Sequence, residues 1–322
     1  TYGKHCATRY NQSYGNWFWL RRGVRLHRRP GLKSMVVFMK IGYAIITRAR
    51  PMALIGTLMT AYKLRASDDV QFACAVDEDD REVVDLARRL ANDIPLIVDE
   101  RPAPSSIGTK WNRLCHDHLR DCDVVCLMTE RMVPITSHWD VEIAATLEAC
   151  PDRPFYWSSP VDQGFAAPCL PRRWLEASKW WPLTERFPFW FTDMWLSEIQ
   201  AMVHGFPLPY TRAAYAGQRK TTMACRDVPF WTKFYDFLAP ERLAEAKRIT
   251  EALGYVWQGV PLAVARKIDA RTQYLRDNGA AMEKIVGDTS PIAERHLVLY
   301  HHNVAQKLRL VCYNFGDYLV AF

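Results

Sequence analysis

The chain has 322 residues, of which 49% are hydrophobic and 24% are charged, and its formal net charge is +7. This composition is typical of a soluble globular protein with one large domain or two smaller ones. The most apolar window, residues 35–62, is interrupted by three basic residues and a proline, so we predict no membrane-spanning helix.

The positive charge is concentrated at the start of the chain. Residues 1–38 contain eight Lys and Arg residues and no Asp or Glu, which leaves 42 − 8 = 34 basic against 35 acidic residues in the remainder. We predict that this segment is a disordered or weakly helical extension. The alternative is a weak contact with nucleic acid or with an anionic membrane surface.

Nine cysteines are scattered along the chain without a Cys-x-x-Cys pair. This pattern argues against a zinc site. It is typical of proteins in a reducing compartment, so we predict a cytoplasmic location.

Short apolar runs alternate with segments of helical spacing through the first half of the chain. In chain order we predict a strand over residues 41–47, a helix over 52–65, a strand over 70–76, a helix over 81–91, a strand over 95–98, a helix over 106–119, a strand over 123–128 and a helix over 141–149. This alternation predicts right-handed crossovers and a mainly parallel sheet, whose ligand site lies beyond the carboxyl ends of the strands. Neither GxGxxG nor GxxxxGK[ST] follows a strand, which argues against a dehydrogenase or a P-loop ATPase.

The second half begins with a short strand at residues 155–157 and continues into a segment rich in aromatic residues. Asp193 stands in that segment among tryptophans and phenylalanines, and residues from about 240 onward show helical spacing. We predict three parts: the basic extension 1–38, an α/β domain over 39–210 and a mostly helical region over 211–322.

Five segments lie in order between about residues 40 and 209: ITRARPMALIGTL, VDEDD, GTKWNRL, DVVCLMTERMVPITSHWD and FPFWFTDMWLSEI. Together they resemble a glycosyltransferase of the GT-A fold in the broad family-2-like group. The resemblance implies a Rossmann-like GT-A domain that moves a sugar from a nucleotide-diphosphate-sugar donor to the hydroxyl of an unknown acceptor. Such a transfer needs a cation to neutralise the leaving diphosphate and a carboxylate base for the acceptor.

The resemblance also assigns roles at the donor side. Thr47, Arg48 and Arg50 would contact the base and phosphates, while Asp77 and Asp79 would accept hydrogen bonds from the base or ribose. The alternative for the acidic run after the second strand is a solvated loop at a helix start. Lys110 and Asn112 would hold the donor's sugar or diphosphate.

The metal position departs from the family pattern. The family has Asp-Asp or Asp-x-Asp there, whereas this chain has Thr129-Glu130-Arg131. Three interpretations stay open: Glu130 holds Mn²⁺ or Mg²⁺, with His204 as a further ligand; Arg131 replaces the metal as a fixed cation; or donor binding is lost. A His at a helix end is also typical of a cap or a surface residue.

The acceptor side is implied by the last matching segment. Asp193 falls at the position of the catalytic base, and an alternative is that it caps the following helix. Trp190 and Trp195 would line the acceptor site, or would belong to the core. A non-catalytic nucleotide- or glycan-binding protein of the same fold is the alternative function, and a nucleotidyltransferase is a third.

Overall fold

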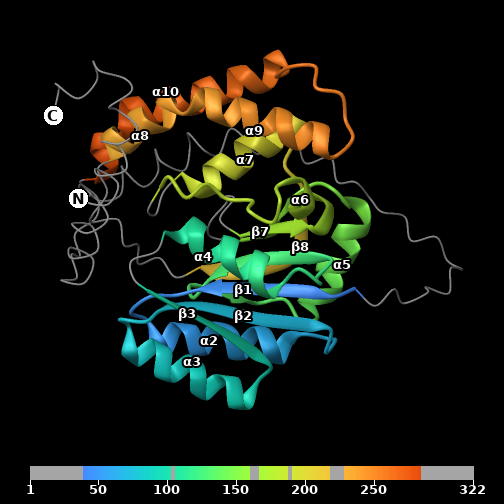
Figure 1. The fold of residues 1–322 in the computed structure, drawn as a ribbon, viewed down its shortest axis with the longest axis vertical. Coiled ribbons are helices and arrows are strands. Elements are labelled where there is room, and N and C mark those ends of the chain that lie inside the picture. Colours follow the sequence, from blue (N-terminus) through green and yellow to red (C-terminus); the bar gives the residue numbers. More distant parts are fainter. Residues whose placement is uncertain (1–38, 103–105, 160–166, 188–190, 218–227, 284–322) are drawn as a thin grey trace, which may run out of the picture. The chain divides into compact units, whose positions relative to one another are not determined.

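The computed structural model describes residues 39–102, 106–159, 167–187, 191–217 and 228–283 (Figure 1). The predicted extension over residues 1–38 lies outside these ranges. In the described part an eight-stranded sheet has the strand order β3-β2-β1-β4-β7-β6-β8-β5. The strands are β1 Ile41–Ile46, β2 Val70–Asp77, β3 Leu96–Arg101, β4 Val124–Thr129, β5 Met132–Pro134, β6 Phe155–Ser158, β7 Pro168–Pro171 and β8 Tyr210–Gly217.

Helices occupy the connections and the C-terminal third of the described chain. They are α2 Pro51–Leu64, α3 Arg81–Asp93, α4 Ile107–Arg113 with the π-helix η1 Leu114–His118, α5 Trp139–Ala149, α6 Arg172–Ala177, α7 Thr192–His204, α8 Val228–Phe237, α9 Ala239–Ala252 and α10 Leu262–Glu283. Among the described helices none is both long enough and apolar enough to cross a lipid bilayer.

The strands β3, β2, β1 and β4 run parallel, and β7 adds to β4 antiparallel. All six residues of β1 are buried, as expected for a parallel strand covered on both faces. One apolar core contains residues of α2, α3 and α5, and a second contains residues of α4, α6, α7, α8 and α9. Figure 1 shows α2 and α3 on one face of the sheet and α4 and α7 on the other. The predicted α/β fold is therefore confirmed.

The Trp-Asp pair of the fourth matching segment fixes the start of α5 against the end of α2. Trp139 is fully buried, and its indole N–H donates to Ala61 O at 2.9 Å. The Asp140 carboxylate accepts the backbone N–H groups of Ala66 and Ser67 at 2.8 to 3.0 Å. The pair therefore stabilises the fold and holds the connection that leads into β2.

The predicted boundary between residues 210 and 211 falls inside β8. This strand pairs with both β6 and β5. The core under α7 also continues into Trp231 and Tyr235 of α8. Backbone hydrogen bonds and shared packing thus join the two sides of that boundary.

Candidate functional site

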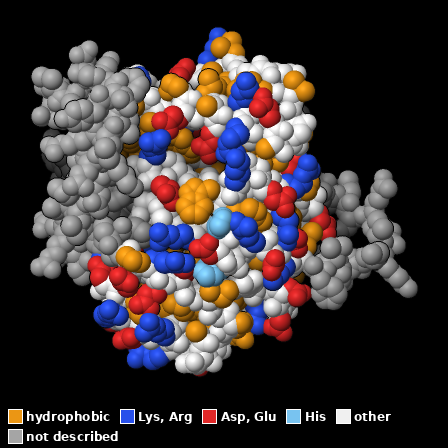
Figure 2. Space-filling model, in the orientation of Figure 1, with side chains coloured by type: hydrophobic (Ala, Val, Ile, Leu, Met, Phe, Trp, Pro, Cys, Tyr) orange, Lys and Arg blue, Asp and Glu red, His pale blue; other side chains and the backbone are white. Residues whose placement is uncertain are grey.

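The carboxyl ends of β1, β2 and β4 meet at one edge of the sheet because these strands are parallel and in register. Thr47 and Arg48 follow β1, Asp77 ends β2, and Glu130 and Arg131 follow β4. On the face in Figure 2 basic and acidic side chains lie interspersed over the described surface. At the strand ends the charged side chains form two groups of ion pairs, one centred on Asp77 and one on Glu130.

The first group is centred on the buried carboxylate of Asp77. Its Oδ2 accepts from Lys110 Nζ at 2.6 Å and from Arg48 Nη1 at 2.5 Å. Arg48 also donates from both terminal nitrogens to Asp79, at 3.0 and 2.9 Å. Four of the residues predicted at the donor side are therefore brought together, and bidentate pairing of this kind fixes the direction of a guanidinium group.

The charge state of Asp77 follows from these partners. Its side chain is 1% exposed, so burial by itself would raise the pKa of the carboxyl. The positive charges of Lys110 and Arg48 and their hydrogen bonds outweigh this effect, and the net result is a lowered pKa. Asp77 is thus held ionised as a fixed acceptor.

The second group lies at the end of β4, where the resemblance places the metal. Glu130 Oε1 accepts from Arg50 Nη1 at 2.6 Å, and Arg131 Nε lies 4.0 Å from the same oxygen. The Glu130 carbonyl oxygen accepts from Thr57 Oγ1 at 2.7 Å. Burial, and then the charge of Arg50, lower the pKa of Arg131, with Glu130 opposing them. Two guanidinium groups therefore flank a single buried carboxylate.

This donor set does not fit a resident divalent ion. Mg²⁺ and Mn²⁺ prefer several oxygen ligands, and one oxygen of Glu130 already accepts a short bond from a guanidinium group. In the residues that the structure describes, no three His, Cys, Asp or Glu side chains gather where an ion could be held.

The predicted metal ligand His204 is placed at the other edge of the sheet, which corrects that prediction. The residues before β6 contact the end of α7, where Arg153 donates to Gly205 O at 3.0 Å. Because β6 and β4 are both antiparallel to β7, the start of β6 lies at the edge where β4 begins. Burial lowers the pKa of His204, whose ring packs 5.8 Å from that of Trp174.

Asn112 supports α4 from within. It is fully buried, and its amide donates to Leu183 O at 2.8 Å and accepts from Leu183 N at 2.9 Å. A Cβ atom added at Gly108 would lie 2.2 Å from Thr184 O, so the same segment passes closely over the start of α4. Asn112 is therefore placed to fix the helix that carries Lys110, and not to face a donor sugar.

Asp193 lies at the start of α7, which packs beside the start of α4. A Cβ atom at Gly108 would lie 3.6 Å from Thr192 Cγ2, and Thr192 begins α7. Asp193 is half-buried in the first turn, and its Oδ1 accepts from Met194 N at 2.9 Å. The packing thus brings the predicted base to the helix that carries Lys110.

Of the two tryptophans predicted to line the acceptor site, Trp190 and Trp195, the structure describes Trp195. Trp195 is 2% exposed, its ring packs among aromatic residues, and its N–H donates to Glu245 Oε2 at 2.7 Å. This position makes it a core residue without a free ring face for a sugar. Trp190 lies outside the described residues.

Two residues at the edge were missed from the sequence. Asp80 accepts the backbone N–H of Ala49 at 2.5 Å, and Ala49 has φ of 53°, so this carboxylate holds the loop between the two arginines. Arg101 is the register partner of Asp77 and donates to Asp99 at 2.9 Å. The sequence signal for both was their place in the polar segments that follow predicted strands, four residues after residue 76 and three after residue 98.

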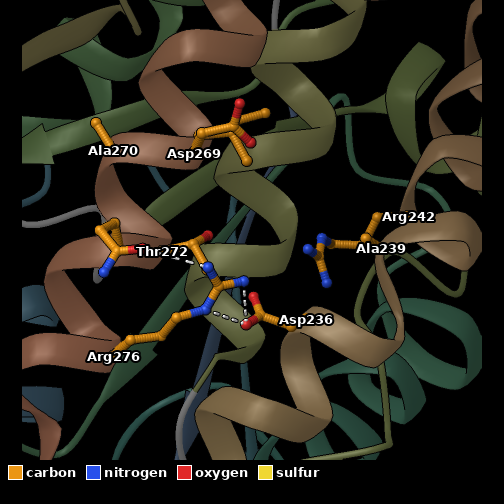
Figure 3. A pocket seen from close by; sticks show the side chains of 9 residues that line it. Asp236, Ala239, Arg242, Asp269, Ala270, Thr272 and Arg276 are labelled. Carbon is orange, nitrogen blue, oxygen red and sulfur yellow. Dashed lines mark hydrogen bonds and ion pairs between the residues drawn. The ribbon is translucent and has the colours of Figure 1, made fainter.

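A cavity of about 460 Å³ lies away from this edge, among α8, α9 and α10 (Figure 3). Both of its arginines are already engaged: Arg276 donates to Asp236 at 2.7 Å, and Arg242 lies 3.1 Å from buried Glu198. These pairs neutralise one another, which makes the cavity a poor place for a diphosphate.

No protein-family model and no curated protein matches this sequence. Solved structures do match the fold. The mannosyltransferase PcManGT of Pyrobaculum calidifontis, in complex with GDP-Man and Mn²⁺, aligns with a TM-score of 0.50 and 12% identity over 83% of this chain and 86% of its own. TarS 1–349 of S. aureus, in complex with UDP-GlcNAc, aligns with a TM-score of 0.50 and 10% identity over 66% and 70%. The chain therefore has the fold of these glycosyltransferases.

Proposed function

We propose that this protein transfers a sugar from a nucleotide-diphosphate-sugar donor to an acceptor hydroxyl, with the carboxyl edge of the sheet as the donor site. The observation that carries the proposal is the gathering of four cationic side chains at that edge of a glycosyltransferase fold. They are Arg48, Arg50, Lys110 and Arg131. Nucleotide-sugar complexes of both similar structures support the same class of donor.

The nucleoside would lie against the Asp77 group. Arg48 orients Asp79, whose carboxylate would accept hydrogen bonds from the base or ribose. The hydroxyl of Thr47 is buried and has no hydrogen-bond partner within the described part of the chain, which supports its predicted contact with the donor. Lys110 would keep Asp77 ionised and approach the phosphates.

The diphosphate would be neutralised by Arg50 and Arg131. A guanidinium group has five N–H donors, so Arg50 can bond Glu130 and a phosphate oxygen together. Charge-assisted bonds of this kind stabilise the negative charge that develops on the leaving group. Glu130 then acts as a positioning residue for the two arginines.

Transfer itself needs one bond to break and one to form. The bond between the anomeric carbon and the diphosphate oxygen breaks, and that oxygen keeps the electron pair. The acceptor oxygen bonds to the carbon, and its proton passes to Asp193 as general base. A carboxylate base at the acceptor side suits inversion of configuration.

Two alternatives have their own observations. The mannosyltransferase was solved with Mn²⁺, which supports a metal-assisted alternative in which Glu130 would be the carboxylate that holds Mn²⁺ or Mg²⁺ and the ion would neutralise the diphosphate. The ion pairs that already engage Asp77 and Glu130 favour a protein that binds a nucleotide or glycan without turnover. The acceptor and the cytoplasmic location remain predictions from the sequence.

The test is release of nucleoside diphosphate from UDP-, GDP-, CDP- and dTDP-sugars, with water and with a mixture of methyl glycosides as acceptors. The proposal expects release from one nucleotide class, which methyl glycosides accelerate and Asp193→Asn slows by about 10²-fold or more. Binding of a nucleotide sugar without any release would favour the non-catalytic alternative. The absence of both binding and release with every donor tested would contradict the proposal.

A further inference from the structure

The connection between α9 and α10 and the first residue of α10 carry the two most exposed large apolar side chains of the described C-terminal region, Val256 and Leu262. Val256 is 81% exposed, Leu262 is 66% exposed and Tyr255 is 45% exposed. This connection is the orange loop at the right of Figure 1. Leaving large apolar groups in water on one short segment of the chain costs free energy, so the pattern points to an interaction.

The loop is held in place by its own packing. The hydroxyl of Tyr255 donates to Asp152, and its ring lies edge-on to that of His204 at 5.9 Å. Trp257 and Val260 pack against the core under α7. Because these neighbours are anchored while Val256 is not, Val256 projects outward from a fixed base.

Positive charge accompanies the apolar side chains. Residues 252–268 contain no Asp or Glu, and exposed Arg266 stands one helical turn after Leu262 on the same face of α10. Lys267, also exposed, follows it, and its ammonium lies 4.5 Å from the centre of the Phe206 ring. The next acid, Asp269, is seven residues beyond Leu262, which is about 10 Å along the helix.

We propose that residues 254–267 bind the surface of an anionic lipid bilayer. Val256 and Leu262 enter the boundary between headgroups and acyl chains, and Arg266 and Lys267 bind the headgroup phosphates. A protein partner fits less well, because a stable protein interface buries about 800 Å² on each side, more than one narrow loop presents. The proposal does not depend on the donor site.

The test is sedimentation of the full chain with vesicles of phosphatidylcholine alone and of phosphatidylcholine with about 30% phosphatidylserine. We expect binding to the second kind of vesicle, and a loss of about tenfold or more in affinity for the double variant Val256→Glu/Leu262→Glu. The matched control is Ile135→Glu, because Ile135 is also exposed, at 51%, but lies after β5. This control should bind as the unchanged protein does.

Insertion of the loop is distinguished from simple attraction of the basic residues 1–38 by fluorescence. Lipids whose acyl chains carry bromine near the headgroup should quench the fluorescence of Trp257. The loss of tryptophan fluorescence should therefore be smaller in the Trp257→Phe variant than in the unchanged protein. Binding that is equal in the unchanged protein and the double variant would overturn the proposal, because charge in residues 1–38 would then suffice. Absence of binding to both kinds of vesicle would overturn it as well and would favour a protein partner.

Discussion

Arg50 Nη1 lies 2.6 Å from Glu130 Oε1, although the two residues are 80 positions apart in the sequence. The pair joins the loop after β1 to the end of β4. Arg131 approaches the same carboxylate oxygen from the next position of the chain. The acid that the family resemblance assigns to a metal therefore holds a guanidinium group in this protein.

The first prediction concerns Arg50. Arg50→Gln removes a charge-assisted bond to the diphosphate, so the dissociation constant of the bound nucleotide in EDTA should rise about tenfold, which is about 1.4 kcal/mol. Isothermal titration calorimetry measures this directly. The matched control is Arg65→Gln at the other end of α2, where Arg65 bonds Asp68. An equal effect of both substitutions would contradict a phosphate contact by Arg50.

The second prediction concerns Asp77 and the dependence of stability on pH. Asp77→Asn leaves the buried ammonium of Lys110 without its carboxylate, so the free energy of unfolding at about pH 7 should fall by about 3 kcal/mol. The pKa of Asp77 is lower in the folded protein than in the unfolded chain, where it is about 4. The ionised carboxylate therefore contributes fully to the free energy of unfolding above about pH 4, and this contribution is lost as the pH falls through the pKa of the folded protein.

Urea unfolding at about pH 7 and about pH 3 measures both effects of Asp77→Asn. The difference between the unchanged protein and the variant should be large at the higher pH and should shrink at the lower one. Asp85→Asn, on the exposed face of α3, should change stability little at either pH. A difference that does not depend on pH would rule out an ionised Asp77 as its source.

The third prediction concerns Asp193. Asp193→Asn removes the proposed base, so kcat for release of nucleoside diphosphate should fall by about 10²- to 10⁴-fold while the donor dissociation constant is unchanged. Asp93→Asn, at the exposed end of α3, is the control and should retain full activity. Full activity of Asp193→Asn would remove Asp193 from the mechanism.

The fourth prediction compares two helical glycines. A Cβ at Gly108 would lie 2.2 Å from Thr184 O, whereas a Cβ at Gly56 in α2 meets no atom within 4 Å. Gly108→Ala should therefore lower the free energy of unfolding by about 2 kcal/mol because the backbone must move apart. Gly56→Ala should raise it by about 0.5 kcal/mol. Urea unfolding of both variants checks the pair, and equal effects would contradict the close approach.

Much of the sheet could be predicted from local patterns. Three strands are almost continuously buried apolar runs followed by polar loops, over residues 41–46, 70–77 and 124–129. Such runs predict a parallel sheet and the edge at which a ligand binds. β5, β7 and β8 were not predicted. β7 has only four residues, with a proline at each end, and its pairing with β4 depends on a contact more than 40 residues away.

The site was predictable only in part, because sequence adjacency does not give the direction of a side chain. Arg131 adjoins Glu130 in the sequence, yet Arg50 makes the short bond. Asn112 was predicted at the donor and His204 at the metal. The side-chain amide of Asn112 is buried and bonds Leu183, and His204 is the last residue of the 13-residue helix α7, which begins at Thr192. Such outcomes depend on tertiary packing.

The central claim is that arginines, without a divalent ion, hold the donor's diphosphate. The most direct measurement is the melting temperature of the protein with UDP, GDP, CDP or dTDP in EDTA and again with Mn²⁺, because a ligand of the native state raises it. The account predicts that one nucleotide raises the melting temperature equally in both conditions and that Arg50→Gln removes the increase. An increase that appears only with Mn²⁺ would contradict it.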